Sequence, residues 1–128
     1  MARILITGSN SGFGKLAALT FARLGHDVVA TMRTLEKGAD LRATAEAERL
    51  PIEIRRLDVT DAASVAEGVG DPAEIDAVVN NAGFEAWGAL ELIDDLLWTR
   101  QLDTNVLGPM RVIRHVLPAW RERGSGTI

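Results

Sequence analysis

Two residue types, cysteine and tyrosine, are missing from this 128-residue sequence, and each absence excludes a kind of chemistry. There is no cysteine, which excludes disulfides, thiolate metal sites and a cysteine nucleophile. There is no tyrosine, so no phenol is available as an acid or base. The two histidines, His26 and His115, lie too far apart in sequence to suggest a metal pair, and we expect no metal site.

The sequence also lacks long apolar runs and any excess of positive charge. No run approaches the roughly 18 to 20 apolar residues of a membrane span, and the N-terminus has no signal-peptide pattern. The net charge is −4 and the 14 basic residues are scattered, which argues against a nucleic acid or an anionic membrane as a partner. We therefore expect a cytoplasmic protein that forms one compact domain over residues 1–128.

The sequence does contain a short apolar run that leads into three closely spaced glycines. Residues 2–6 are almost all apolar and rich in β-branched side chains, which is typical of a strand buried on both faces. Gly8, Gly12 and Gly14 follow, and a helical pattern then continues to Gly25. The apolar residues of that pattern are Leu16, Leu19, Ala22 and Leu24. A strand, a glycine turn and a helix in this order favour an anion at the helix N-terminus, where backbone N–H groups are unpaired.

The rest of the chain alternates expected strands with expected helices. We predict further strands at 26–31, 52–57 and 75–79, and helices at 35–50, 61–69 and 94–123. Short connections between them indicate an α/β fold, a doubly wound parallel sheet with strand order 3-2-1-4. The alternating strand 52–57 is expected at the sheet edge, Thr60 as the cap of the next helix, and 127–128 as the start of a truncated fifth strand. Ligands would bind outside the carboxyl ends of the first and fourth strands.

The expected helix 94–123 has two unusual features. Its apolar stripe is wider than one sheet face needs, which suggests a second partner surface. The stripe consists of Leu102, Val106, Met110, Ile113, Leu117 and Trp120, widened by Leu96, Val112 and Val116. Pro109 lies inside the helix and has no N–H to donate, so we expect a free carbonyl oxygen at Asn105.

Residues 7–14, TGSNSGFG, resemble the TGxxxGxG turn of the classical short-chain dehydrogenase/reductase family. Three further motifs resemble that family in the same order: LDVTD at 57–61, NNAG at 80–83 and a DxNxxGP pattern at 103–109. A glycine-rich turn that binds nothing is the alternative for the first motif taken alone. The resemblance covers the whole chain and implies a Rossmann domain that binds NAD(P).

The resemblance also implies roles for particular residues. The cofactor-binding positions that it indicates are Gly8, Ser9, Ser11, Gly12, Phe13, Gly14, Asp58, Val59, Asn81, Ala82, Gly83 and Val106. Asp58 would accept a hydrogen bond from the adenine amino group; the alternative is a carboxylate that stabilises the helix after it. Asn105 would belong to the catalytic tetrad, and its free carbonyl would hold a water that connects a catalytic lysine with solvent.

Arg33 carries the prediction of cofactor preference. It follows the second strand, where an NAD-selective site would place an acidic side chain for the ribose 2′-hydroxyl. Because a guanidinium pairs with a 2′-phosphate, we expect NADP(H) rather than NAD(H), with Ser11 as a second phosphate ligand by resemblance. An exposed loop arginine is the alternative. The segment ATMR at 30–33 also resembles hydroxysteroid and retinol-type members of the family.

The serine, tyrosine and lysine of the family's chemistry have no counterpart in place here, which leaves three hypotheses. The first is the amino-terminal part of an NADP-dependent oxidoreductase, truncated, that acts on an alcohol or carbonyl substrate. The second is a short protein that binds NADP(H) without turnover, and the third is a protein-interaction module. We also expect self-association through the exposed fourth strand and, by resemblance, a homo-oligomer through the 94–123 helix.

Overall fold

The computed structural model describes residues 1–128, which alternate between strands and helices. The strands are β1 (Arg3–Ile6), β2 (Asp27–Met32), β3 (Ile52–Arg56) and β4 (Ala77–Val79). The α-helices are α1 (Gly12–Arg23), α2 (Ala39–Glu48), α3 (Ala62–Val69), α4 (Asp95–Leu102) and α5 (Gly108–Arg123). Short 3-10 helices lie at Leu35–Gly38, Pro72–Glu74 and Leu90–Leu92, and a π-helical turn at Asp103–Leu107, called the π turn below, joins α4 to α5.

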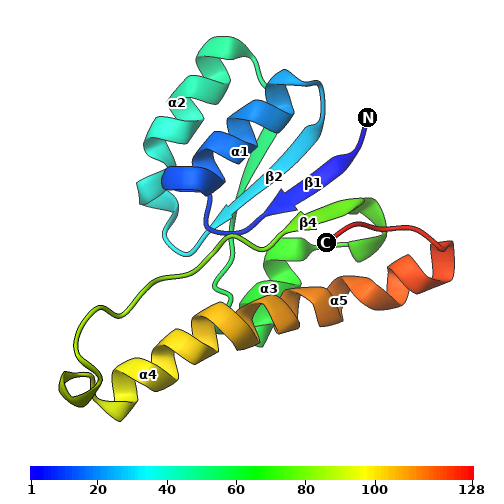
Figure 1. The fold of residues 1–128 in the computed structure, drawn as a ribbon. Coiled ribbons are helices and arrows are strands. Elements are labelled where there is room, and N and C mark those ends of the chain that lie inside the picture. Colours follow the sequence, from blue (N-terminus) through cyan, green and yellow to red (C-terminus); the bar gives the residue numbers. More distant parts are fainter.

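The four strands form one parallel sheet in the order β3-β2-β1-β4, which confirms the predicted doubly wound architecture. Helices α1 and α2 cover one face of the sheet, while α3 and α5 cover the other (Figure 1). Each face has its own apolar core, because alternate side chains of a strand point to opposite faces. Ile4 and Ile6 of β1 belong to the core with α1, and Leu5 between them belongs to the core with α3 and α5.

The outer edge of β4 has very little pairing. Thr127 forms an isolated parallel bridge with Ala77. The Val78 N–H donates to the Thr127 carbonyl at 2.9 Å, and the Thr127 N–H donates to the Asp76 carbonyl at 3.1 Å. The predicted start of a fifth strand is therefore a single bridge.

Two expected elements differ from the observed ones near their ends. The expected helix 35–50 is divided into a 3-10 helix and α2, and it ends where Arg49 takes a left-handed backbone conformation with φ of 54°. The fourth strand begins at Ala77 rather than at residue 75. Asp71 caps the 3-10 helix Pro72–Glu74, so the chain enters the sheet only after that helix.

The predicted apolar stripe of helix 94–123 is only partly buried: Val112, Val116 and Trp120 belong to the core, whereas Leu96, Leu102, Val106 and Met110 are exposed. The structure interrupts this helix at the π turn, where the Gly108 N–H donates to the carbonyl of Asp103, five residues earlier instead of four. Side chains before and after the turn therefore do not share one stripe of 3.6-residue period. Leu102, Val106 and Met110 are 55%, 49% and 48% exposed. The core residues of α5 are Val112, Val116 and Trp120.

The prediction for the buried face of α1 is also wrong in part. Leu16 and Leu24 are 60% and 69% exposed, although both belong to the predicted stripe. The buried residues of α1 are Gly14, Ala18, Leu19 and Ala22. Three of these four are small, which lets the helix lie close to the sheet.

Candidate functional site

A cavity of about 540 Å³, called the cleft below, opens where the sequence predicts the ligand site, at the carboxyl ends of the strands. Eight of the predicted residues line it: Gly8, Ser11, Arg33, Asp58, Val59, Asn81, Ala82 and Gly83. They come from the four connections that follow β1, β2, β3 and β4. The parallel order of the strands thus brings together motifs that are far apart in the sequence.

The turn after β1 approaches the turn after β4 closely. Gly8 has a φ of 69°, and a Cβ there would lie 2.8 Å from the Ala82 Cα, so this position requires glycine. A Cβ on Gly14 would collide with the Gly8 carbonyl oxygen and with the side-chain nitrogen of Asn81. Helix α1 starts at Gly12, and no side chain caps its first N–H groups, which leaves them available for an anion.

Thr7 and Asn81 fasten these two turns together. The buried Thr7 hydroxyl oxygen accepts the N–H groups of Asn81 and Ala82, each at 3.0 Å. The Asn81 side-chain nitrogen donates to the carbonyl oxygens of Thr7 and Gly8, again at 3.0 Å each. One wall of the cleft is therefore held by four hydrogen bonds between segments that are adjacent only in the fold.

Asp58 and Arg33 line the cleft from neighbouring strand ends. Partial burial would raise the pKa of the Asp58 carboxyl, but hydrogen bonds from Thr60 and the charges of Arg33 and Arg56 keep that pKa below its usual value. Both Thr60 bonds, from the hydroxyl at 2.7 Å and the N–H at 3.0 Å, end on Oδ1, so Oδ2 remains for a ligand. Thr60 therefore binds Asp58 and does not cap α3 as predicted. Asp61 caps α3 by accepting two N–H groups of its first turn.

The predicted catalytic residue, Asn105, lies in the π turn and does not line the cleft. Its side-chain oxygen accepts the Phe84 N–H at 3.0 Å, and its side-chain nitrogen donates to the Phe84 carbonyl at 2.8 Å. Both ends of the amide thus bind the segment that continues from NNAG. The free Asn105 carbonyl was expected because Pro109, four residues later, has no N–H to donate. The π turn changes this spacing to five residues just before Pro109, so the free carbonyl stays a prediction.

Five predicted cofactor residues lie outside the wall of the cleft: Ser9, Gly12, Phe13, Gly14 and Val106. Ser9 is fully buried, and its hydroxyl donates to the Ile6 carbonyl at 2.9 Å. Phe13 is 85% exposed at the start of α1, and Val106 is about half exposed in the π turn. A cofactor contact of these residues stays a prediction.

Seven residues of the cleft were not among the predicted site residues: Asn10, Leu57, Thr60, Phe84, Arg100, Asp103 and Thr104. Leu57 and Thr60 lie within the LDVTD motif, Asp103 and Thr104 lie within the DxNxxGP pattern, and Phe84 begins the loop 84–90 that was expected to contribute to substrate selection. Arg100, Asp103 and Thr104 follow an i, i+3, i+4 spacing in α4 and the π turn, and this polar spacing was the signal available for them. Arg111 supports this side of the cleft, since its guanidinium binds the Asp103 carboxylate at 2.6 Å and the Val59 carbonyl at 3.0 Å. The cleft therefore has a second wall, built by the helical segment after the loop.

The fold is that of a Rossmann-type domain, and the cleft lies where the strand order reverses. No helix in the structure is both long enough and apolar enough to cross a membrane. The sequence profile of the family described as short chain dehydrogenase matches residues 2–128. The chain belongs to this family of oxidoreductases, whose members use NAD(P).

Curated relatives and solved structures agree with this assignment. The chain is 40% identical over 129 residues to the uncharacterized oxidoreductase YusZ of Bacillus subtilis, an alignment that covers 97% of the chain and 46% of that protein. It is 37% identical over 131 residues to retinol dehydrogenase 8 of Bos taurus, covering 98% and 42%. A gluconate 5-dehydrogenase from Burkholderia cenocepacia J2315, in complex with NADP and tartrate, has a TM-score of 0.86 at 29% identity, covering 98% and 51%. The chain thus spans about half the length of these proteins.

Proposed function

We propose that residues 1–128 form the NADP(H)-binding domain of a short-chain oxidoreductase, which transfers hydride between NADP(H) and an alcohol or carbonyl substrate. The observation that carries this proposal is the meeting of the glycine turn, Asp58 and Arg33 at one cleft. Where an NAD-selective site has a carboxylate, β2 is followed by Arg33. The related gluconate 5-dehydrogenase was solved with NADP. A cytoplasmic location is part of the same proposal, and cell fractionation would test it.

The residues present fit this cofactor. A Cβ on Gly12 would meet no atom within 4 Å, so the N-terminus of α1 opens onto free space that suits a pyrophosphate. Oδ2 of Asp58 is available to the adenine amino group, and Arg33 and Ser11 would bind the 2′-phosphate. The remaining proposed contacts are Gly8, Ser9, Phe13 and Gly14 at the phosphates, Val59 at the adenine ring, and Asn81, Ala82, Gly83 and Val106 elsewhere along the cofactor.

A bound nicotinamide would donate or accept the hydride, and the protein would bind and orient it. Asn105 would take the place of the tetrad asparagine and hold a water through its carbonyl. Residues 1–128 contain no tyrosine, so none of them is proposed as the acid that protonates the substrate oxygen. The serine, tyrosine and lysine of the family's mechanism would have to come from outside it.

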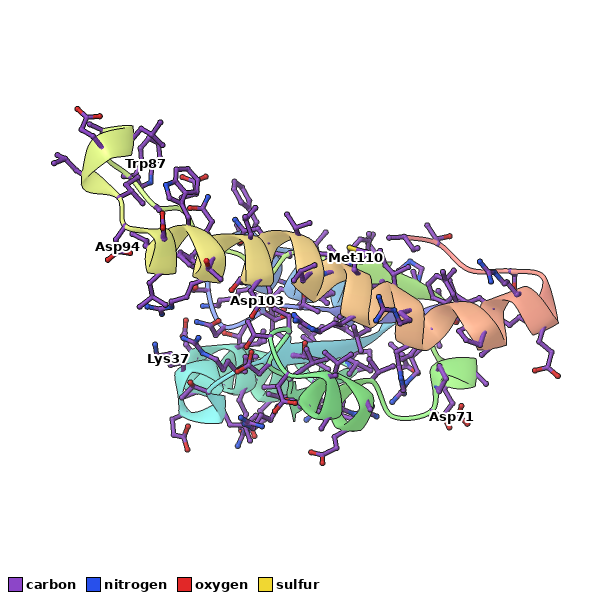
Figure 2. The ribbon with its side chains drawn as sticks, turned by 90° about the horizontal axis from the view of Figure 1, so that it is seen from below. Lys37, Asp71, Trp87, Asp94, Asp103 and Met110 are labelled. Atoms are coloured by element: carbon purple, nitrogen blue, oxygen red, sulfur yellow. The ribbon has the colours of Figure 1, made fainter.

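A non-catalytic NADP(H)-binding or protein-interaction module is the second candidate. Helix α4, the π turn and α5 form one long helical rod in front of the sheet (Figure 2). Exposed apolar side chains along this rod favour the second candidate. These residues are Leu96, Leu102, Val106, Leu107 and Met110, with exposures between 45% and 68%. The same surface supports the proposed homo-oligomer through residues 94–123, because apolar patches of this kind are frequent at interfaces. Neither a nucleic acid nor a membrane is part of the proposal.

Titration of Arg33→Ala with NADPH and NADH tests the cofactor preference. Removal of the guanidinium should weaken NADPH binding by about tenfold or more, because a charge-assisted hydrogen bond contributes roughly 1.5–3 kcal/mol. Binding of NADH should change by less than about twofold, since NADH has no 2′-phosphate to lose a partner. Nicotinamide fluorescence on binding provides the measurement.

Arg42→Ala is the matched control, because Arg42 is an exposed arginine of α2 that does not line the cleft. It should leave both affinities unchanged. An equal loss for NADPH and NADH in Arg33→Ala, or no loss for either, would refute recognition of the 2′-phosphate by Arg33. If the unaltered chain binds neither cofactor, the interaction module becomes the better function.

A further inference from the structure

Two amide side chains, one helical turn apart, hold the segment that leaves the cleft wall. Asn105 in the π turn binds the Phe84 backbone through both ends of its amide, at 3.0 and 2.8 Å. Gln101 in α4 accepts the Ala86 N–H through Oε1 at 3.0 Å. Among residues 83–88, Phe84 and Ala86 are the ones whose backbone N–H groups donate hydrogen bonds. The Phe84 N–H donates to Asn105, and the Ala86 N–H donates to Gln101.

The order and spacing of the two contacts suit a chain segment that runs antiparallel to the helix. Residues four apart in a helix are about 6 Å apart along its axis, and residues two apart in an extended chain are about 6.6 Å apart. Gln101 and Asn105 can therefore meet Ala86 and Phe84 in antiparallel order. Alternate N–H groups of an extended chain point to the same side, which is what the two bonds require.

This segment connects the cleft wall with an exposed apolar loop. Gly83 and Phe84 line the cleft, and a Cβ on Gly83 would lie 3.0 Å from Oδ1 of Asn105. Trp87 is 84% exposed and lies close to the start of α4, at the far end of the rod (Figure 2). Loops with few buried contacts open locally at low cost in free energy. A motion of the loop at Trp87 would therefore displace the wall residues Gly83 and Phe84 unless a contact held the chain between the loop and the wall.

We propose that Gln101 is a positioning residue for the cleft. It fixes Ala86, so that residues 83 and 84 keep their place in the wall while the loop beyond them moves. Thr7 and Asn81 hold the other end of the same wall, next to the sheet. The role of Gln101 in cofactor binding rests on the function proposed for the cleft, whereas its hold on Ala86 does not.

Amide hydrogen exchange, followed by NMR on the whole 128-residue chain, tests the hold directly. Gln101→Leu keeps the approximate size of the side chain but removes the acceptor, and the Ala86 amide should then exchange about tenfold faster. Gln101→Glu retains a side-chain oxygen at the same position and should restore slow exchange. Thr99→Val, an isosteric change of an exposed residue of α4, is the matched control and should leave Ala86 unchanged. Unchanged exchange in Gln101→Leu would overturn the proposal.

NADPH titration tests whether Gln101 also affects the cleft, because loss of a contact without a role there would leave the NADPH affinity unchanged. Gln101→Leu should weaken NADPH binding by roughly threefold to tenfold, the usual effect of one lost hydrogen bond, and Gln101→Glu should recover it. Faster exchange at Ala86 with unchanged NADPH affinity would overturn the role in the cleft. If the unaltered chain binds no NADPH, the function proposed for the cleft fails, and exchange at Ala86 alone then decides whether Gln101 holds the wall.

Discussion

The β3 edge of the sheet carries charged side chains, whereas the β4 edge carries none. At β3, Glu53 binds Arg3 at 2.7 Å and Arg55 at 2.7 and 2.9 Å. At β4 the strand is Ala-Val-Val, and a single bridge from Thr127 covers it. Next to that edge, Asn80 has both polar side-chain atoms buried without a hydrogen bond. Charged side chains at the β3 edge oppose pairing with another strand, whereas β4 has the apolar composition of an interior strand.

This difference indicates where the domain can accept further structure. A buried polar side chain without a partner destabilises a fold, and unpaired backbone at an apolar edge is a template for another strand. Both features occur at β4. Self-association through the β4 edge therefore stays our prediction for the isolated chain, and the β3 edge serves as the internal comparison.

Trp120 is the largest side chain of the core on the β4 side, so we expect its removal to have the largest effect on stability. The indole is 5% exposed, belongs to the core under α5, and donates to the Ile75 carbonyl at 2.7 Å just before β4. Trp120→Ala should lower the free energy of unfolding by about 3–5 kcal/mol, because it leaves a cavity and removes this bond. Urea unfolding provides the measurement.

Two matched variants separate these contributions. Trp120→Phe keeps most of the apolar volume and should cost less than half as much. Leu41→Ala creates a cavity in the opposite layer, where Leu41 of α2 is fully buried, and should cost about 2–5 kcal/mol. If Trp120→Ala costs no more than Trp120→Phe, the segment before β4 is not anchored by this side chain.

Exchanging the character of the two edges should change self-association in opposite directions. Ala77→Lys adds charge to β4, as charged sheet edges do in natural proteins, and should raise the dissociation constant of self-association by about tenfold. The double change Glu53→Thr and Arg55→Thr removes charge from β3 and should favour association. Sedimentation at micromolar concentrations measures both.

Met110→Lys distinguishes the edge from the helical surface. Met110 is 48% exposed on α5, far from the backbone of β4 in sequence and on a different element. If Met110→Lys dissociates the assembly and Ala77→Lys does not, association uses the α4–α5 surface and the prediction for the edge is wrong. A monomer at all concentrations would contradict both routes.

The sequence is sufficient to predict the strand order and the residues directly after the strands. Gly8, Asp58 and Asn81 each lie a few residues beyond the end of a strand, so a correct strand also places the residues that follow it. Right-handed parallel connections then bring the carboxyl ends to one side of the sheet. This explains why eight predicted residues line the cleft.

Helix faces are harder to predict because periodicity gives the spacing of a stripe and not the surface on which it packs. Leu16 and Leu102 belong to regular apolar patterns, yet both are more than half exposed. The π turn changes the hydrogen-bonding register between α4 and α5, and such turns are rare enough that Pro109 alone does not indicate one. The buried face of α5 therefore follows from tertiary packing.

The contacts that hold the cleft are also beyond sequence reasoning. Thr7 binds Asn81, which is 74 residues away, and Gln101 binds the backbone of Ala86, 15 residues away. Both are bonds between a side chain and a backbone group, so no pattern of paired side chains reveals them. Their partners are determined only when the strands and α4 have taken their places.

The smallest expected effect is the pH dependence of the β3 edge. Hydrogen bonds from the Arg55 guanidinium hold the pKa of the Glu53 carboxyl below its usual value of 4.5; partial burial opposes this effect, and the charges of Arg55 and Arg3 add to it. Because the folded-state pKa is lower than the unfolded one, Glu53 stabilises the fold at neutral pH. This stabilisation is lost as the pH falls below 4.5 and through the folded-state pKa.

Glu53→Gln should therefore lower stability at neutral pH by at most about 1 kcal/mol, since the half-exposed ion pair is screened by solvent, and should have little effect in acid. Urea midpoints at about pH 7 and about pH 3 measure the difference. Glu46→Gln, which changes an exposed glutamate of α2 without an ion pair, should behave as the unaltered chain does. If the pH dependence is the same in Glu53→Gln and in the unaltered chain, the charges at β3 do not stabilise the folded state. The contrast between the two edges would then lie in the apolar β4 strand alone.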